Sequence, residues 1–316
     1  MFKKIFKIER KPKKGLLALE WMIIGYALLT LLIILFTYTK LANPEAMIWG
    51  RVRFFAITAA MWIVYRLVPC RFTMLARITV QMLLLGWWYP DTYELNRILP
   101  NLDYLFAGWE QQLFGSQPAL WLSQVYSSRI ISELMAFGYA AYFPMVVVVV
   151  LYYFLYRYEE YQRASFIILG AFFLYYVIFI FLPVTGPQYY YPAVALENIA
   201  NGVFPQLGDY FNTHQYRMDT PGWKDGFFYQ QVVSMHDAGE RPTAAFPSSH
   251  VGITTVLMML VAHARAKRLF WILFPVYMLL CLSTVYIMAH YVIDALAGLV
   301  TGVIIYVVLL LLSKRV

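Results

Sequence analysis

The sequence predicts an all-α fold: a polytopic membrane helix bundle of about eight transmembrane helices, with cytoplasmic N- and C-termini. Three observations predict it. Of 316 residues, 61% are apolar and only 13% are charged, whereas a soluble domain carries roughly 25% charged residues. Mean hydropathy is +0.61, and the apolar residues gather in long runs. This composition excludes a disordered chain, a soluble enzyme, a coiled coil and a disulfide scaffold, and the two cysteines, Cys70 and Cys281, are not expected to pair.

Eight apolar segments approach the roughly 20 residues that an α-helix needs to cross a bilayer. They are residues 16–38, 47–69, 74–89, 130–156, 164–183, 249–264, 269–288 and 291–312, of which the third and the sixth are short. The fourth segment contains Pro144, which predicts a kink because proline lacks a backbone N–H. The first segment is too long for a cleavable leader, so it is expected to be an anchor.

Basic residues predict how these segments are oriented. With a cytoplasmic N-terminus, the cytoplasmic segments hold 17 of the 25 Lys and Arg residues; these segments are 1–14, 66–77, 157–163, 265–268 and 313–316. Because cytoplasmic loops carry an excess of positive charge, both termini are expected inside. The net charge of +8 then suits a membrane surface rather than nucleic acid.

This threading leaves two large extracytoplasmic loops. Loop 90–129 is expected to lie partly in the membrane interface as short amphipathic helices. Loop 184–246 is rich in aromatic residues, which predict order rather than disorder. The chain divides into a basic tail at 1–15, N-terminal membrane helices with the first loop at 16–129, and a C-terminal membrane core at 130–316 that contains the second loop.

Several ionisable residues near the membrane segments have ordinary explanations. Glu20 is expected at the cytoplasmic interface, beside the basic tail. Arg129 and Glu133 lie one helical turn apart and predict a local ion pair. His263 opens a basic loop and is expected to be solvated. The sequence assigns no role to the two histidines of the second loop, His214 and His236.

Three other residues are predicted to converge at one level of the membrane. His250 lies at the start of the sixth segment, while His290 and Asp294 lie at the start of the eighth. The last two are four residues apart, so both are expected on one face of one helix. The threading places both segment starts at the outer face. Gly298 and Gly302 follow with a small-xxx-small spacing, which lets another helix approach closely.

Two imidazoles and a carboxylate at one level support three interpretations. In phosphoryl chemistry, a neutral imidazole attacks phosphorus, the carboxylate holds it, and the second imidazole protonates the leaving oxygen. Free N–H groups at the start of the sixth segment would bind an anion, and Arg241 would neutralise a phosphate oxygen. Alternatively, the three residues form a metal site of two histidines and one carboxylate. In the third interpretation they are structural groups that hydrogen-bond between helices.

At these positions the sequence resembles the type 2 phosphatidic acid phosphatase superfamily. Its motifs are Lys, six residues, Arg-Pro; then Pro-Ser-Gly-His; then Ser-Arg, five residues, His, three residues, Asp. The matching residues are Arg241-Pro242, Pro247-Ser248-Ser249-His250 with serine in place of glycine, and Ser283, His290 and Asp294. The resemblance implies that His290 is a nucleophile that forms a phosphohistidine, that Asp294 orients it, and that His250 is the acid for the leaving group. It also implies that the phosphate is held by Arg241, Ser248 and backbone groups near Ser249.

Two positions depart from the superfamily pattern. Ser234 stands where the motif has lysine, and Thr284 where it has arginine. A phosphate monoester carries about two negative charges and a diester about one, so the loss of two cations favours a diester. A monoester would need another cation, such as Lys224 or Arg217. The third motif, and Phe246 before the second, are similar to those of the inositol phosphorylceramide synthase branch, which lacks both cations.

That branch implies transfer of phosphoinositol from a phospholipid to a ceramide-type acceptor at the extracytoplasmic face. The alternative is a lipid phosphate phosphatase that hydrolyses a phosphomonoester or diphosphate lipid with the same residues. A metal-dependent membrane oxidase and a transporter or scaffold are further alternatives, although polar residues gathered at one level argue against the last. The expected partners are lipids of the bilayer and not nucleic acid; no metal or other cofactor is expected, and the oligomeric state stays open.

Overall fold

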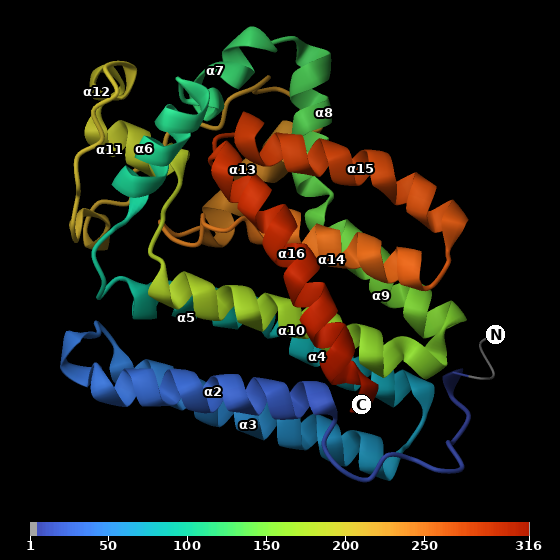
Figure 1. Cartoon of the computed structure of the whole chain (residues 1–316). Coiled ribbons are helices and arrows are strands. Elements are labelled where there is room, and N and C mark those ends of the chain that lie inside the picture. Colours follow the sequence, from blue (N-terminus) through green and yellow to red (C-terminus); the bar gives the residue numbers. More distant parts are fainter. Residues whose placement is uncertain (1–4, 316) are drawn as a thin grey trace.

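The computed structural model describes residues 5–315, and every regular element in this part of the chain is a helix, as predicted. Long helices form a bundle, and shorter helices cover one end of it (Figure 1). The α-helices are α2 (Ala18–Phe36), α3 (Pro44–Leu67), α4 (Arg71–Leu83), α5 (Leu85–Asn96), α6 (Asp103–Phe114), α7 (Pro118–Val125), α8 (Arg129–Ala140), α9 (Tyr142–Tyr156), α10 (Tyr158–Phe181), α11 (Pro187–Val194), α12 (Leu196–Ala200), α13 (Phe227–Gly239), α14 (Ser249–His263), α15 (Lys267–Tyr286) and α16 (Val292–Leu312). Short 3-10 helices are η1 (Tyr38–Lys40), η2 (Tyr210–Asn212) and η3 (Ser313–Arg315).

Within residues 5–315, five helices are long and apolar enough to cross a membrane, which fits an integral membrane protein: α2, α3, α10, α15 and α16. The bent pair α8–α9 would make a sixth crossing. The other two predicted segments are helical but do not reach this length as single helices. Helix α14 has 15 residues, and residues 74–89 divide between α4 and α5, with the polar Arg77 and Gln81 inside α4. The predicted number of eight membrane helices is therefore not confirmed.

The predicted kink in the fourth segment is present. Helix α8 ends at Ala140, α9 begins at Tyr142, and the two axes differ by 47°. Pro144 lies in the first turn of α9, so it has no N–H for the carbonyl of Ala140, four residues earlier. The bend therefore falls one turn before the proline, where that hydrogen bond would have formed.

Helix α10 is the centre of the bundle. Most of its residues are buried, and it contacts α2, α5, α9, α14 and α16. In Figure 1, α2 and α3 lie side by side on one side of α10, while α14, α15 and α16 lie on the other. The N-terminal helices are thus joined to the C-terminal ones through α10.

Two buried ion pairs fasten the N-terminal helices. Arg77 of α4 donates from Nε and Nη2 to Glu20 of α2, at 2.6 and 2.5 Å, and both side chains are fully buried. Arg51 of α3 donates in the same two-pronged way to Asp91 of α5, at 2.9 and 2.6 Å. Glu20 lies in the first turn of α2, but it is fully buried in an ion pair that the sequence does not predict, with a partner 57 residues away.

The five basic segments gather at one end of the bundle, which we call the basic end. Helix α2 begins and α16 ends there (Figure 1). Hydrogen bonds tie these segments together: Glu9 N–H to the Pro69 carbonyl, Tyr158 Oη to Glu9, Arg157 to the Ala264 carbonyl, and Arg163 to Ser313 Oγ. The opposite end, where α14 and α16 begin, we call the site end. The arrangement is the one the charge pattern predicts, while the cytoplasmic location of the basic end stays a prediction. Residues 1–4 of the predicted basic tail lie outside the described residues.

Both large loops fold at the site end. Loop 90–129 contributes α6 and α7, and loop 184–246 contributes α11, α12 and α13. The predicted order of the second loop is confirmed, since Tyr189, Tyr190 and Tyr191 are all buried. Tyr191 Oη donates to Gln117 Oε1 at 2.8 Å and so joins the two loops. The first loop therefore packs on the second, and its contact with a membrane interface stays a prediction.

Candidate active site

Glycines on α16 bring the starts of α14 and α16 together. A Cβ atom on Gly298 would lie 2.4 Å from the Ser248 carbonyl oxygen, and one on Gly302 would lie 2.7 Å from the Gly252 carbonyl oxygen. Only glycine permits such close contact between the two backbones. The backbone N–H of Ser248 also donates to the Asp294 carbonyl, at 3.0 Å. The predicted close approach is therefore present, and it places His250 beside His290.

His290 lies in the turn before α16 rather than on the helix, because α16 begins at Val292. Its side chain is 4% exposed, and Nδ1 lies 2.8 Å from the carbonyl oxygen of Ala245. A carbonyl only accepts, so Nδ1 carries the proton and Nε2 keeps its lone pair. Burial lowers the pKa of His290 to about 4, so the imidazole is neutral at physiological pH. A neutral ring with a free Nε2 is the form that attacks phosphorus.

Asp294 is fully buried behind His290. Its Oδ2 accepts from the backbone N–H of Tyr291 at 2.9 Å and lies 3.6 Å from His290 Nδ1. The second distance is too long for a hydrogen bond, and the Ala245 carbonyl occupies that position instead. The Ala245 carbonyl, and not Asp294, therefore orients the ring of His290. Among the described residues, Oδ1 of Asp294 has no hydrogen-bond partner.

His250 lies in the first turn of α14, against two aromatic rings. Its ring stacks on Tyr139 with centroids 4.6 Å apart, and it contacts Tyr142 at 4.3 Å. The centroids of His250 and His290 are 5.7 Å apart. The structure thus brings together the three residues that the sequence predicts to converge. A phosphorus atom bound to one imidazole would lie within reach of the other.

The predicted phosphate-binding residues differ in their positions. Ser248 caps α14, since its buried hydroxyl accepts from the Val251 N–H at 3.4 Å. Ser249 is half-buried at the first position of α14, next to His250. Arg241 is exposed and donates to Gln215 at 3.4 Å. Of these three, Ser248 and Ser249 lie beside the histidines in sequence and space, while Arg241 makes its contact on the surface.

Lys224, the predicted additional cation, is exposed. Its Nζ pairs with Asp219 at 3.0 Å, and the two side chains are 70% and 81% exposed. A pair this exposed contributes little to holding a substrate in a buried site. Arg217, the other candidate, is only 17% exposed and lies closer to the histidines through its partner Glu240.

A largely buried polar cluster lies beside the histidines and was not predicted from the sequence. Arg217 donates to Glu240 at 3.2 Å and to Asp237 at 3.1 Å, and Gln188 donates to Glu240 at 2.9 Å. His236 Nε2 lies 3.5 Å from Glu240, and burial lowers the pKa of His236 to about 3. Burial raises the pKa of Glu240, against the attraction of Arg217, and the charge of Glu240 in turn favours protonation of His290. Only the position of Glu240 directly before Arg241 could have drawn attention to this cluster.

Two acids of α6 also reach the site and were not predicted. Asp103 accepts from Thr185 N–H and Oγ1, from Gly186 N–H, from Asn101 and from Tyr291 Oη, at 2.6–3.0 Å. Glu110 accepts from the Ile293 N–H at 3.2 Å. The first loop therefore holds both the second loop and the start of α16, next to His290.

The remaining ionisable residues have structural roles. Glu133 accepts from the N–H groups of Phe228 and Tyr229, both at 3.0 Å, and so caps α13. Arg129 instead lies 5.3 Å from the centre of the Trp223 ring, so the predicted ion pair between Arg129 and Glu133 is wrong. His263 is exposed as predicted, and His214 stacks on Tyr210 at the surface. Both cysteines are free, as predicted.

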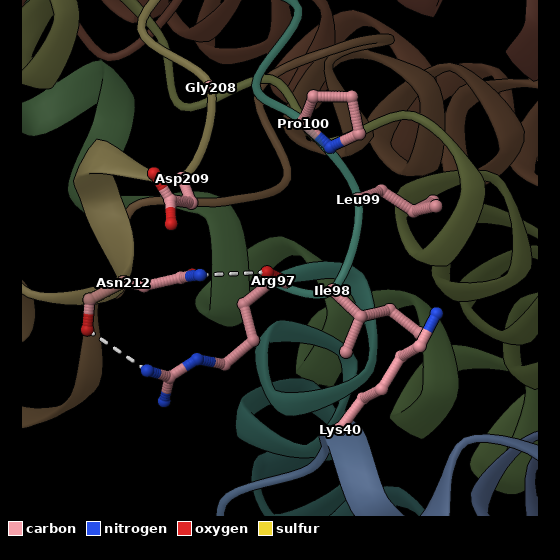
Figure 2. A pocket seen from close by; sticks show the side chains of 8 residues that line it. All are labelled: Lys40, Arg97, Ile98, Leu99, Pro100, Gly208, Asp209 and Asn212. Atoms are coloured by element: carbon pink, nitrogen blue, oxygen red, sulfur yellow. Dashed lines mark hydrogen bonds between the residues drawn. The ribbon is translucent and has the colours of Figure 1, made fainter.

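A cavity at the site end lies away from the histidines. Figure 2 shows this cavity of about 530 Å³, where Arg97 donates to the Asn212 carbonyl at 2.9 Å; it is lined by Lys40, Arg97, Ile98, Leu99, Pro100, Gly208, Asp209 and Asn212. A much smaller space shares Arg97 with it and reaches Thr185 and Pro242. The two imidazoles line neither space.

A metal site has no ligand set in this arrangement. Within residues 5–315, no group of three or more His, Cys, Asp or Glu side chains is placed to hold a metal ion. The geometry agrees better with a pair of imidazoles that act on one phosphoryl group.

Comparison with known proteins agrees with these residues. No curated protein and no solved structure matches the chain. The sequence profile of the PAP2 superfamily matches residues 105–308, which include most of α6, the second loop and the paired histidines. Because this match spans more than half of the chain, the protein belongs to the PAP2 superfamily, whose members are phosphatases or phosphotransferases.

Proposed function

We propose that this protein is a membrane lipid phosphotransferase. It moves a phospho-head-group, with phosphoinositol as the best candidate, from a phospholipid to a ceramide-type acceptor. The proposal rests on superfamily membership and on one observation, the shortage of cations around the paired histidines. Ser234 is exposed and donates to the Gln230 carbonyl of its own helix. Thr284 is fully buried and donates to the Cys281 carbonyl.

Neutral residues at both positions favour a substrate with a single negative charge. Arg241 is exposed, and Arg217 is already paired with Glu240 and Asp237. A monoester dianion would need several free cations, whereas a phosphodiester carries about one negative charge. A lipid phosphodiester is therefore the donor that suits this site.

The proposed reaction has two steps at phosphorus. In the first, Nε2 of His290 bonds to phosphorus and the bond from phosphorus to the diacylglycerol oxygen breaks, while His250 donates a proton to that oxygen. In the second, His250 takes the proton of the acceptor hydroxyl, whose oxygen attacks phosphorus and releases His290. The negative charge of Asp294 stabilises the positive charge on His290 between the two steps. The exchange conserves one phosphodiester.

Burial of His290 supports transfer rather than hydrolysis. His290 is 4% exposed, and the half-buried His250 packs against Tyr139 and Tyr142. A covalent intermediate in such a place is protected from water until a lipid acceptor arrives. The alternative, a phosphatase for phosphomonoester or diphosphate lipids, gains support from Arg217, which would supply a cation if a substrate displaced Glu240.

Transfer of a labelled head group tests the proposal. Purified protein in detergent is given phosphatidylinositol labelled in its phosphoryl group, with and without ceramide. We expect label on ceramide, and none with His290→Ala. His214→Ala is the matched control, because His214 is an exposed histidine of the same end of the molecule. Release of water-soluble phosphate with or without ceramide would support the phosphatase and overturn the transferase.

A further inference from the structure

Helix α6 presents a carboxyl group to the start of α16 whose hydrogen bonds are incomplete. Glu110 is fully buried, although it lies in a loop between membrane segments. Its Oε2 accepts from the backbone N–H of Ile293 at 3.2 Å. Among the described residues, its Oε1 has no hydrogen-bond partner. A buried carboxyl oxygen without a partner is costly, so this group needs an explanation.

Asp294 has the same deficiency at the same helix start. Its Oδ2 accepts from the Tyr291 N–H at 2.9 Å, and its Oδ1 is the second unpartnered carboxyl oxygen at this place. The two acids therefore bind N–H groups that are two residues apart. They are close enough for the charge of Asp294 to raise the pKa of Glu110. Two such carboxylates cannot both be ionised without strong repulsion.

The surroundings of Glu110 favour its protonated form. Burial raises the pKa of Glu110 to about 8, against the N–H of Ile293, which favours the ionised form. The titratable groups that face it are Asp294 on α16 and Tyr191 on α11. Cations occur in none of these places, so nothing nearby favours a second negative charge. Asp294 remains the acid 3.6 Å from His290.

A proton on Glu110 would meet both unsatisfied needs at once. A protonated carboxyl has one O–H to donate, and an ionised carboxylate oxygen is the strongest acceptor in the neighbourhood. We infer that Glu110 is a positioning residue: in its protonated form it donates a hydrogen bond to Oδ1 of Asp294 and so holds that carboxylate ionised beside His290. The role in catalysis rests on the proposed function of His290, while the protonation of Glu110 does not.

The inference predicts an alkaline limit to activity. Below about pH 8 Glu110 keeps its proton and Asp294 is held. Above it, Glu110 loses the proton, the hydrogen bond is lost, and two negative charges repel each other. Asp294 then moves away from His290, and turnover falls.

The variant Glu110→Gln tests the positioning role through its pH profile. Glutamine has almost the same shape, its carbonyl still accepts from Ile293, and its NH₂ still donates to Asp294 at every pH. We expect turnover within about threefold of the parent at neutral pH and no alkaline decline near pH 8. An unchanged alkaline decline, or a loss of more than about tenfold at neutral pH, would overturn the inference.

Infrared spectroscopy tests the protonation without any turnover. The parent protein at neutral pH is expected to show the C=O stretch of a buried protonated carboxyl, which disappears above about pH 8 and is missing from Glu110→Gln. Glu133→Gln is the matched control and should keep the band, because Glu133 caps α13 by accepting two N–H groups. A band that survives Glu110→Gln would overturn the inference. This measurement gives the same answer if the protein transfers no phosphoryl group, so the two proposals can fail separately.

Discussion

The buried acids of the N-terminal helices and the buried acids of α6 and α16 differ in the groups that bind them. Arg77 binds Glu20 and Arg51 binds Asp91, each through two hydrogen bonds from one guanidinium. At the site end, the buried acids of α6 and α16 bind backbone N–H groups instead, without a guanidinium. The N-terminal pairs lie outside the residues that match the PAP2 profile, and the site acids Glu110 and Asp294 lie inside them.

The difference separates structural charge from charge that is available for chemistry. A carboxylate paired with arginine is cancelled, so it fixes two helices and has little effect elsewhere. A carboxylate held by N–H groups keeps its charge, which acts on whatever lies nearby. In the proposed mechanism Asp294, 3.6 Å from His290, is the carboxylate that acts on the imidazole, whereas the charge of Asp91 is cancelled by Arg51. Substitutions in the two regions are therefore expected to have different effects, on stability in the N-terminal helices and on turnover at the site end.

The largest effect is expected from His290→Ala. Loss of the nucleophile should lower turnover by about 10³-fold or more, while the unfolding temperature stays close to that of the parent. His290 makes one side-chain hydrogen bond, to Ala245, so its removal costs little stability. Lipid phosphotransfer and thermal unfolding in detergent measure the two quantities. Near-normal turnover would show that another residue is the nucleophile.

A smaller loss is expected from His250→Ala, and it should depend on the leaving group. Removal of a general acid costs about 10²–10⁴-fold when the leaving oxygen needs a proton. With a donor lipid that releases a nitrophenol, which leaves without a proton, most of the loss should disappear. An equal loss with both donors would contradict the role of acid and would indicate that His250 only packs against Tyr139.

Breaking an N-terminal pair should affect stability and not chemistry. Arg77→Met leaves Glu20 buried without its partner, and the free energy of unfolding should fall by about 3–5 kcal/mol. The double variant Glu20→Leu, Arg77→Met should recover most of that loss, because no charge is left uncompensated. Denaturant unfolding measures both. If the single and double variants are equally stable, the uncompensated charge of Glu20 is not the cause of the lost stability.

The smallest effect concerns acid pH. Because burial lowers the pKa of His290 from its usual 6.5 to about 4, the nucleophile stays neutral as the pH falls through 6.5. The acid limb that this residue contributes to kcat/KM should therefore lie near pH 4. Stability should fall over the same range of pH. The unfolded chain binds this proton below pH 6.5 and the folded protein only below about pH 4, so the folded state loses stability as the pH falls from 6.5 to about 4. A limb near 6.5 would show that His290 is exposed to water.

Much of the fold could be predicted because it depends on local patterns. Apolar runs predict helices, Pro144 predicts the bend, and the distribution of Lys and Arg predicts which segments share an end. The approach of His250 to His290 could also be predicted, because Gly298 and Gly302 of α16 let the backbones of α14 and α16 come close together. Each of these features depends on a pattern of residue types along the chain and not on a contact between two particular side chains.

The remaining features depend on contacts between distant segments. Asp103 contacts Tyr291 across 188 residues, and Glu110 contacts Ile293 across 183, with no spacing rule that links them. The partner of His290 Nδ1 is a backbone carbonyl, which leaves no trace in the sequence. Lys224 was chosen for its charge alone, and its position on the surface depends on the fold of loop 184–246.

The central claim is that Nε2 of His290 carries the phosphoryl group between donor and acceptor. The most direct measurement is to incubate the protein with the labelled donor lipid, quench in alkali, where phosphohistidine survives, and locate the label by peptide mapping. We expect label on the peptide that contains His290. This label should disappear when ceramide is added before the quench, and His290→Ala should carry no label. Label on another residue, or turnover without any covalent label, would contradict it.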